Sequence, residues 1–281
     1  MSKNILITGA SQGIGKAIVI ELIKSLKDIN LILIARNEEK LRSIFDEIKD
    51  NSPKSKYYVC DIGNLDSIKN TYEKIEKDFG EISVLINNAG VQKPIGEFWT
   101  VDFDLWRKNI QTNFLGLAFL TYLILPGMIK KGKGKIINFS GGGATGPRTF
   151  FSAYACAKTA VVKFTETLAD ELNAKEVNVS INAVAPGAIN TNMLKEVLEI
   201  GENLGKEYED AKNRNETGGT DIRFILDLIK FLISDKANGI SGKLISAPWD
   251  NWSEERIINK LKNNKNFASL RKIDEKYFGE I

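Results

Sequence analysis

Short, almost wholly apolar runs alternate along the chain with longer amphipathic segments. Runs this short cannot form helices, and continuous apolar character is typical of strands buried on both faces of a parallel sheet. The alternation predicts an α/β fold: a doubly wound parallel sheet of about seven strands with helices on both faces. The predicted strands are Ile5–Thr8, Leu31–Ala35, Tyr57–Cys60, Val84–Ile86, Ile136–Phe139, Val179–Ala185 and Lys243–Ser246. The predicted helices include Gly15–Lys27, Glu38–Lys49, Leu65–Phe79, Val101–Lys130 and Ala153–Asn173.

No linker, repeat or low-complexity tract interrupts this alternation, so we expect a single domain over residues 1–281. Two regions depart from the pattern. Residues 190–219 are polar and helical without a strand, and residues 250–281 form a charged tail after the last strand.

The composition excludes several classes of chemistry. The chain has no histidine, which excludes Ser-His-Asp and Cys-His catalysis and HExxH zinc sites. Its 39 basic and 36 acidic residues give a net charge of +3. A charge this close to balance does not indicate binding to nucleic acid or to a membrane surface.

The cysteines and the apolar segments suggest where the protein works. Cys60 and Cys156 lie far apart and outside any CxxC motif, so we expect neither a metal site nor a disulfide framework. The longest apolar-rich segment, Phe114–Ile129, is interrupted by Gly116 and Pro126 and is too short to span a membrane. We therefore expect a cytoplasmic protein.

A glycine-rich turn follows the first predicted strand. It reads Thr8-Gly9-Ala10-Ser11-Gln12-Gly13-Ile14-Gly15 and leads directly into a predicted helix. Glycines at such a position let backbone N–H groups approach a pyrophosphate at the helix N-terminus. The spacing, Gly-x-x-x-Gly-x-Gly, is one residue longer than the common dinucleotide fingerprint, and an ordinary turn is the alternative.

Further motifs follow the later strands in order. They are Asn87-Asn88-Ala89-Gly90, Asn113, Tyr154-x-x-x-Lys158, and Pro186-Gly187 with Thr191. Together with the glycine turn, they resemble the short-chain dehydrogenase/reductase family over roughly residues 3 to 247. The resemblance implies a Rossmann-type fold and a nicotinamide-dependent oxidoreductase that interconverts a carbonyl and a secondary alcohol. It also implies that residues 190–219 form the substrate loop.

Tyr154 and Lys158 are four residues apart on a predicted helix, so their side chains share one face. A nearby lysine cation favours the tyrosinate and is expected to lower the tyrosine pKa toward neutrality. The resemblance implies that Tyr154 transfers the proton, that Lys158 also holds the nicotinamide ribose, and that Asn113 anchors a water beside Lys158. The alternatives are a surface Tyr/Lys pair and helix-kink hydrogen bonding by Asn113.

The resemblance also assigns a set of cofactor contacts. Asp61 corresponds to the adenine contact, with a helix cap or turn role as the alternative. The full predicted set is Gly9, Ser11, Gln12, Gly13, Ile14, Gly15, Arg36, Asp61, Ile62, Asn87, Ala89, Gly90, Tyr154, Lys158, Pro186, Gly187, Ile189 and Thr191.

The end of the second strand bears on the choice between NADP and NAD. It reads Ala35-Arg36-Asn37, without the carboxylate that would bind a free ribose 2′-hydroxyl. Arg36 can bind a 2′-phosphate, and Ser11 could donate to the same group. We therefore predict NADP rather than NAD. A solvated charge at the strand end is the alternative for Arg36.

One position departs from the family pattern. The family places a substrate-binding serine where this chain has Gly141, and the neighbouring hydroxyl belongs to Ser140. Ser140 is the predicted substitute, through a loop that Gly141-Gly142-Gly143 makes adaptable. The alternatives are Thr145, Tyr154 acting alone, and a buried structural hydroxyl at Ser140.

The sequence does not identify the substrate. The predicted substrate loop mixes Met193, Leu194, Leu198 and Leu204 with many charges, and Phe150, Phe151, Trp249 and Trp252 are candidate pocket or packing residues. A cofactor sensor without turnover and a sugar-nucleotide-modifying enzyme are the alternative functions. By resemblance we expect a homodimer or homotetramer that pairs through the long helices Val101–Lys130 and Ala153–Asn173.

Overall fold

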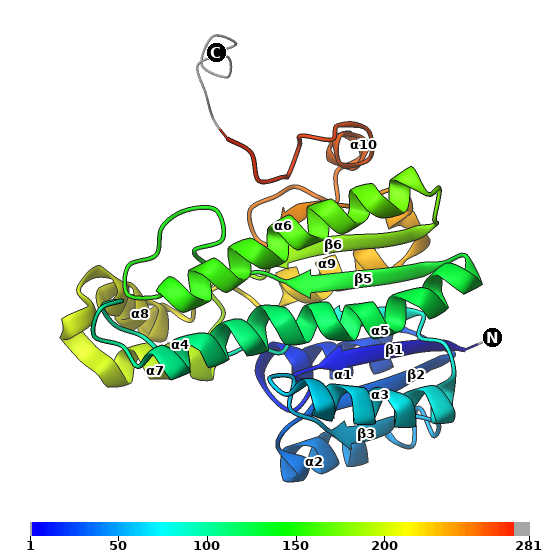
Figure 1. Cartoon of the computed structure of the whole chain (residues 1–281), viewed down its shortest axis with the longest axis horizontal. Helices are drawn as coiled ribbons and strands as arrows, with labels where there is room; N and C mark the ends of the chain where they lie inside the picture. Colours follow the sequence, from blue (N-terminus) through cyan, green and yellow to red (C-terminus); the bar gives the residue numbers. More distant parts are fainter. Residues whose placement is uncertain (1, 273–281) are drawn as a thin grey trace.

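A seven-stranded, all-parallel sheet forms the centre of the computed structural model, which describes residues 2–272 (Figure 1). The strand order is β3-β2-β1-β4-β5-β6-β7, which confirms the predicted doubly wound α/β fold. The strands are β1 (Lys3–Thr8), β2 (Ile29–Ala35), β3 (Lys56–Val59), β4 (Val84–Asn87), β5 (Gly134–Phe139), β6 (Val179–Ala185) and β7 (Leu244–Ser246).

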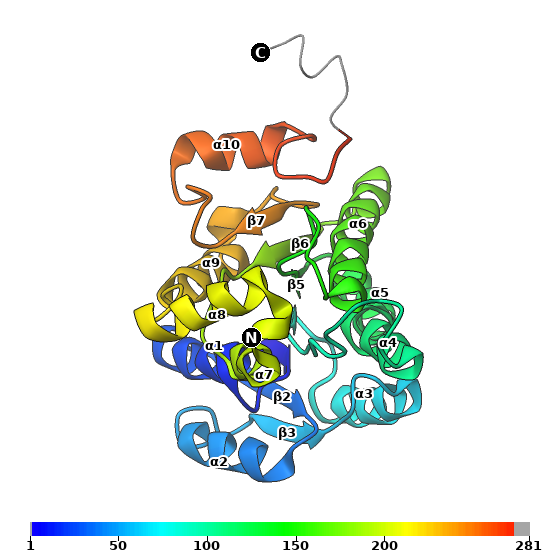
Figure 2. The same ribbon diagram turned by 90° about the vertical axis from the view of Figure 1, so that its left-hand side faces the viewer.

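Helices cover both faces of the sheet, as Figure 2 shows. One layer holds α1 (Gly13–Ser25), α2 (Glu38–Ile48) and α9 (Arg223–Ile233). The other holds α3 (Leu65–Phe79), α4 (Phe103–Ile110), α5 (Gly116–Lys131) and α6 (Ser152–Ala174).

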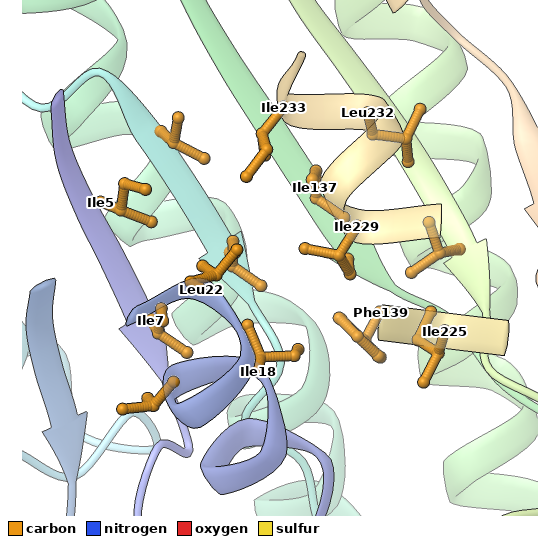
Figure 3. Close-up of a cluster of buried hydrophobic side chains, with 14 of the residues drawn as sticks. Ile5, Ile7, Ile18, Leu22, Ile137, Phe139, Ile225, Ile229, Leu232 and Ile233 are labelled. Carbon is orange, nitrogen blue, oxygen red and sulfur yellow. The ribbon is translucent and has the colours of Figure 1, made fainter. Parts of the chain in front are cut away.

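The two apolar cores arise from the alternation of side chains along each strand. In β1, Ile5 and Ile7 pack on the α1 and α9 side, whereas Leu6 packs with the opposite layer. Figure 3 shows the first core, in which Ile18 and Leu22 of α1 lie near β1. Because both faces of each central strand are covered, these strands carry few polar residues.

The direction in which strands are added to the sheet reverses between β1 and β4. From β1 the chain continues outward through β2 and β3, and from β4 it continues the other way through β5, β6 and β7. Ile7 of β1 lies beside Leu33 of β2 on one side and Ile86 of β4 on the other. In such sheets the crevice beyond the carboxyl ends at this point is where ligands bind. The glycine turn after β1 begins at this crevice.

The long helix predicted at Val101–Lys130 contains a π-helical turn. The π-helix Gln111–Leu115 joins α4 to α5 and carries Asn113 at its centre. The combined helix Phe103–Lys131 is the one helix of the described chain that is long and apolar enough to cross a membrane. Here it is a core helix of the fold, because α4 packs on α6 and α5 packs on α3 and β5.

The predicted substrate loop is helical, as expected, and lies beyond the carboxyl ends of the strands (Figure 2). Leu194, Val197 and Leu204 form a small apolar cluster with Phe151 and Tyr154 of the main body. This loop contains α7 (Asn192–Ile200), the 3-10 helix Gly201–Leu204 and α8 (Lys206–Thr217).

The C-terminal segment is anchored to the outer edge of the sheet by buried charges. The Lys243 Nζ donates to the carbonyl oxygens of Asn264 (2.6 Å) and Phe267 (3.0 Å). The Glu166 carboxylate accepts from the Leu270 backbone N–H and from Arg271. The remaining helical elements are the 3-10 helix Asp235–Ala237 and α10 (Glu255–Asn263). Of the predicted tail 250–281, residues 273–281 lie outside the described residues.

Candidate active site

A cleft of about 1440 Å³ opens at the carboxyl ends of the strands, beneath the predicted substrate loop. Most residues predicted from the sequence lie on its walls, although they come from seven separate segments. These residues are Gly9, Ser11, Gln12, Gly13, Ile14, Arg36, Asp61, Ile62, Ala89, Gly90, Ser140, Tyr154, Lys158, Pro186, Gly187, Ile189 and Thr191.

Three predicted residues do not line the cleft: Gly15, Asn87 and Asn113. Asn87 is buried in the interior, where its Nδ2 donates to Thr121 Oγ1 (3.2 Å) and Asn138 Oδ1 (2.9 Å). The next residue of the motif, Asn88, lies on the cleft wall instead, although it is not in the predicted set of cofactor contacts. Side chains alternate across a strand end, so this alternation could have identified Asn88.

The glycine turn leaves the N-terminus of α1 open toward the cleft. Gly13 has φ +54°, and Gly9 has φ +66° with its Cα so close to the β4 loop that an added Cβ would lie 2.9 Å from Ala89 Cα. Gln12 at the N-cap makes no side-chain hydrogen bond to the helix, and the first turn has no acidic residue. The first N–H groups are therefore available to an anion, which fits the pyrophosphate of a dinucleotide.

Tyr154 and Lys158 lie near the N-terminus of α6, and both are buried. The Lys158 Nζ is 5.5 Å from the Tyr154 ring centroid and donates to the Phe139 carbonyl oxygen at 2.8 Å. Burial lowers the pKa of Lys158 to about 8. The ammonium has two further N–H groups that can hold ribose hydroxyls.

The pKa of Tyr154 differs from the sequence-based expectation. Burial raises it, and the cation whose charge opposes this rise is Arg148 rather than Lys158. The physical reason is that the phenol is removed from water, which disfavours the tyrosinate. Spacing along the helix predicted the Tyr/Lys pair but could not predict its burial.

The Asn113 and Lys158 side chains both lie next to Gly90, at one corner of the site. A Cβ at Gly90 would lie 2.8 Å from Asn113 Oδ1 and 3.6 Å from Lys158 Nζ. The Asn113 Oδ1 accepts from Val91 N–H (3.1 Å), and its Nδ2 donates to Val91 O (2.7 Å) and Asn109 Oδ1 (2.7 Å). The π-helical turn thus holds Asn113 against the loop that follows β4.

Ser140 and Gly141 occupy the end of β5 beside Tyr154. The Ser140 hydroxyl is buried and donates to the Lys158 backbone carbonyl at 3.3 Å. A Cβ at Gly141 would lie 2.5 Å from the Tyr154 hydroxyl oxygen, so this phenol already fills the space of a side chain at 141.

The far end of the cleft carries positive charge. Arg36 lies exposed after β2, and Lys40, one turn into α2, also lines the cleft. The Lys40 Nζ donates to Gln12 Oε1 at 2.9 Å, which brings this cation to the glycine turn. Lys40 is not among the predicted contacts, although its place four residues after Arg36, in the first turn of the predicted helix, could have indicated it.

The position of Asp61 is compatible with both a turn role and a cofactor contact. Its carboxylate accepts from the Gly63 N–H at 2.9 Å, which stabilises a turn, and it also lines the cleft. No group of three metal-ligating side chains occurs among residues 2–272.

The two tryptophans of the C-terminal segment lie in different environments. Trp249 is 72% exposed and borders the cleft. Trp252 packs on Phe231 of α9, with ring centroids 5.4 Å apart, and its indole N–H donates to the Ala247 carbonyl oxygen.

Comparison with known proteins identifies the family. The short chain dehydrogenase family model matches residues 3–200. The chain is 33% identical over 245 residues to a 3-oxoacyl-(acyl-carrier-protein) reductase of Thermotoga maritima, covering 85% of this chain and 94% of that protein. It is 33% identical over 213 residues to the 15-hydroxyprostaglandin dehydrogenase (NAD⁺) of Macaca fascicularis, covering 73% and 75% respectively.

Two solved structures show the same architecture. A variant of actinorhodin polyketide ketoreductase with NADPH superposes with a TM-score of 0.78 at 26% identity, covering 87% of this chain and 95% of that one. An NAD⁺-bound xylitol dehydrogenase gives a TM-score of 0.77 at 25% identity, covering 87% and 96%. The chain therefore belongs to the short-chain dehydrogenase/reductase family, whose members are oxidoreductases that act on CH–OH groups with NAD or NADP.

Proposed function

We propose that this protein is an NADP(H)-dependent oxidoreductase that interconverts a carbonyl and a secondary alcohol, with Tyr154 as the acid/base. The observation that carries the proposal is the convergence of Tyr154, Lys158 and the open N-terminus of α1 on one cleft. The relatives named above reduce oxo groups or oxidise hydroxyl groups according to their names. The test is NADPH consumption with a panel of 3-oxo esters, cyclic ketones and sugars.

In the proposed mechanism the nicotinamide supplies hydride to the carbonyl carbon when it is bound. Tyr154 donates its hydroxyl proton to the carbonyl oxygen, which gives the alcohol and a tyrosinate. Lys158 would hold the hydroxyls of the nicotinamide ribose. Asn113 acts as a positioning residue, because it fixes the loop at Val91 and the corner beside Lys158. Proton return to Tyr154 from solvent completes the cycle.

The preference for NADP is assigned to the cations at the adenosine end. Arg36 and Lys40 both border this end of the cleft, while the residues that directly follow β2 include no carboxylate before Glu38. A 2′-phosphate there would receive charge-assisted hydrogen bonds and would offset the exposed positive charge.

We expect NADP to bind at least about tenfold more tightly than NAD, because a charge-assisted contact contributes roughly 1.5–3 kcal/mol. Arg36→Ala and Lys40→Ala should each weaken NADP binding and leave NAD binding nearly unchanged. Lys49→Ala is the matched control, since Lys49 lies at the other end of α2 and pairs with Asp46. Equal calorimetric affinities of the parent protein for the two cofactors would refute this preference.

We propose Ser140 as one donor to the substrate oxygen, which requires its hydroxyl to turn away from the Lys158 carbonyl oxygen when the substrate binds. Ser140→Ala should then lower kcat by ~10²-fold, as loss of one oxyanion donor does. A change of less than about threefold, with cofactor affinity and circular dichroism unaltered, would leave Ser140 with only its bond to the Lys158 carbonyl.

Self-association is proposed through an exposed apolar face of the π-helix and α5. Leu115, Tyr122 and Ile129 recur every seven residues and are 43%, 70% and 42% exposed, so one helix face presents them together. An apolar stripe of this kind marks an interface, and isologous pairing would give a dimer or tetramer. Tyr122→Glu should lower the mass measured by light scattering, whereas Phe224→Glu on α9, a similarly exposed control, should not. A monomeric parent at micromolar concentration would contradict the proposal.

The alternative functions differ from this proposal in one measurable respect. A cofactor sensor would bind NADPH without consuming it, and a sugar-nucleotide-modifying enzyme would be active only with nucleotide sugars.

We also propose that the chain works as one domain in a reducing, cytoplasmic compartment. Both cysteines are free thiols, one buried and one exposed.

A further inference from the structure

Beside Tyr154, where the family places a substrate-binding serine, this chain has Gly141 and therefore no hydroxyl. At Gly141 an added Cβ would lie 2.5 Å from the Tyr154 hydroxyl oxygen and 3.2 Å from its Cζ. Ser140 uses its hydroxyl on the Lys158 carbonyl oxygen, and residues 141–143 are glycines without side chains. The developing negative charge on the substrate oxygen therefore calls for a second donor from elsewhere in the cleft.

Arg148 lies over the glycines that follow β5. The ideal Cβ of Gly142 would be 3.8 Å from Arg148 Cδ and 3.9 Å from its Nη1, and that of Gly143 would be 3.3 Å from Arg148 Cβ. A side chain at 143 would crowd the arginine, whereas a Cβ at 142 would make an ordinary van der Waals contact with it. The guanidinium also stacks on the Phe151 ring, 3.7 Å from its centroid, one helical turn before Tyr154. Arg148 and Tyr154 line the same cleft.

Two contacts orient the guanidinium and leave part of it free to bind a ligand. The Arg148 Nε donates to Glu207 Oε2 at 3.0 Å, and Nη1 donates to Gln92 Oε1 at 3.4 Å. A guanidinium has five N–H groups in a fixed plane, so three remain beyond these two. The Arg148 side chain is only 15% exposed, which strengthens its interaction with an oxygen in the cleft.

We propose that Arg148 donates a hydrogen bond to the substrate oxygen that Tyr154 protonates, in place of the serine hydroxyl for which Gly141 leaves no room. This inference rests on the proposed function. The same cation stabilises the tyrosinate left after proton transfer, which agrees with its opposition to the burial-induced rise of the Tyr154 pKa. Glu207 belongs to α8, so the position of the substrate loop and the orientation of the donor are linked through one ion pair.

The test compares Arg148→Met with Arg148→Lys in the reduction of ethyl acetoacetate, or of the best substrate from the carbonyl panel. Arg148→Met should lower kcat by ~10²-fold with NADPH affinity unchanged, and Arg148→Lys should recover part of that loss. The pKa of Tyr154, followed by NMR of isotope-labelled tyrosine without substrate, should be higher in Arg148→Met than in the parent.

Glu207→Gln separates this role from a structural one. It breaks the ion pair but keeps the arginine, so it should raise KM more than it lowers kcat and should not raise the pKa of Tyr154. Equal losses of kcat in Arg148→Met and Glu207→Gln, or a kcat within about threefold of the parent in Arg148→Met, would overturn the proposal. Failure of the proposed function is distinguishable, because the parent protein would then consume no NADPH with the carbonyl panel, or Tyr154→Phe would retain turnover whatever Arg148 does.

Discussion

Tyr154→Phe is expected to lower turnover by ~10³-fold, because it removes the only atom that transfers the proton while it preserves the ring packing. NADPH affinity should change little, since the phenol oxygen faces Gly141 and the substrate space. Steady-state rates on the best carbonyl substrate and fluorescence titration of NADPH measure the two effects separately.

The matched control is Tyr208→Phe. Tyr208 packs in the same apolar cluster of the substrate loop, and removal of its hydroxyl should leave kcat within about threefold of the parent. Near-normal turnover in Tyr154→Phe would show that another group transfers the proton.

Lys158→Met is expected to abolish both tight cofactor binding and turnover, and to change how stability depends on pH. Burial lowers the pKa of Lys158 in the folded protein to about 8, from about 10.4 in the unfolded chain. Between these values the unfolded state binds more protons than the folded state. The contribution of Lys158 to the free energy of unfolding therefore rises with pH in this window.

Below pH 8 the folded protein bears the full cost of burying the ammonium, and above about pH 10.4 that cost is gone. Relative to Lys158→Met, the parent should gain about 3 kcal/mol of stability as pH rises through this range. Urea denaturation of the cofactor-free proteins at several pH values measures this difference. Parallel pH profiles for the two proteins would mean that Lys158 is not desolvated as the structure has it.

The fold was largely predictable because the central strands are buried on both faces. Ile5–Thr8 has one polar residue and Val179–Ala185 has two, so both are recognisable as apolar runs, and both lie within or match observed strands. Helix boundaries were less certain: α1 begins at Gly13 rather than Gly15, because the turn itself supplies the first helical residues. The π-helical turn at Gln111–Leu115 was not predictable, since apolar residues continue on both sides of it.

The candidate site was predictable where spacing along one element determines it. Tyr154 and Lys158 share a face because four residues make about one helical turn. Arg148 could not be identified in this way. Its place depends on the path of the glycine-rich loop and on an ion pair with Glu207, which is 59 residues away in the chain. Contacts of this kind are products of tertiary packing and leave no local periodic signal.

The most direct measurement of the central claim is the transfer of deuterium from NADPH labelled at the reactive nicotinamide carbon to the product of the best carbonyl substrate. The proposed function predicts a secondary alcohol that carries one deuterium at the former carbonyl carbon, with none formed above background by Tyr154→Phe. Tight NADPH binding without any deuterated product, across the whole carbonyl panel, would contradict it and would favour a cofactor sensor.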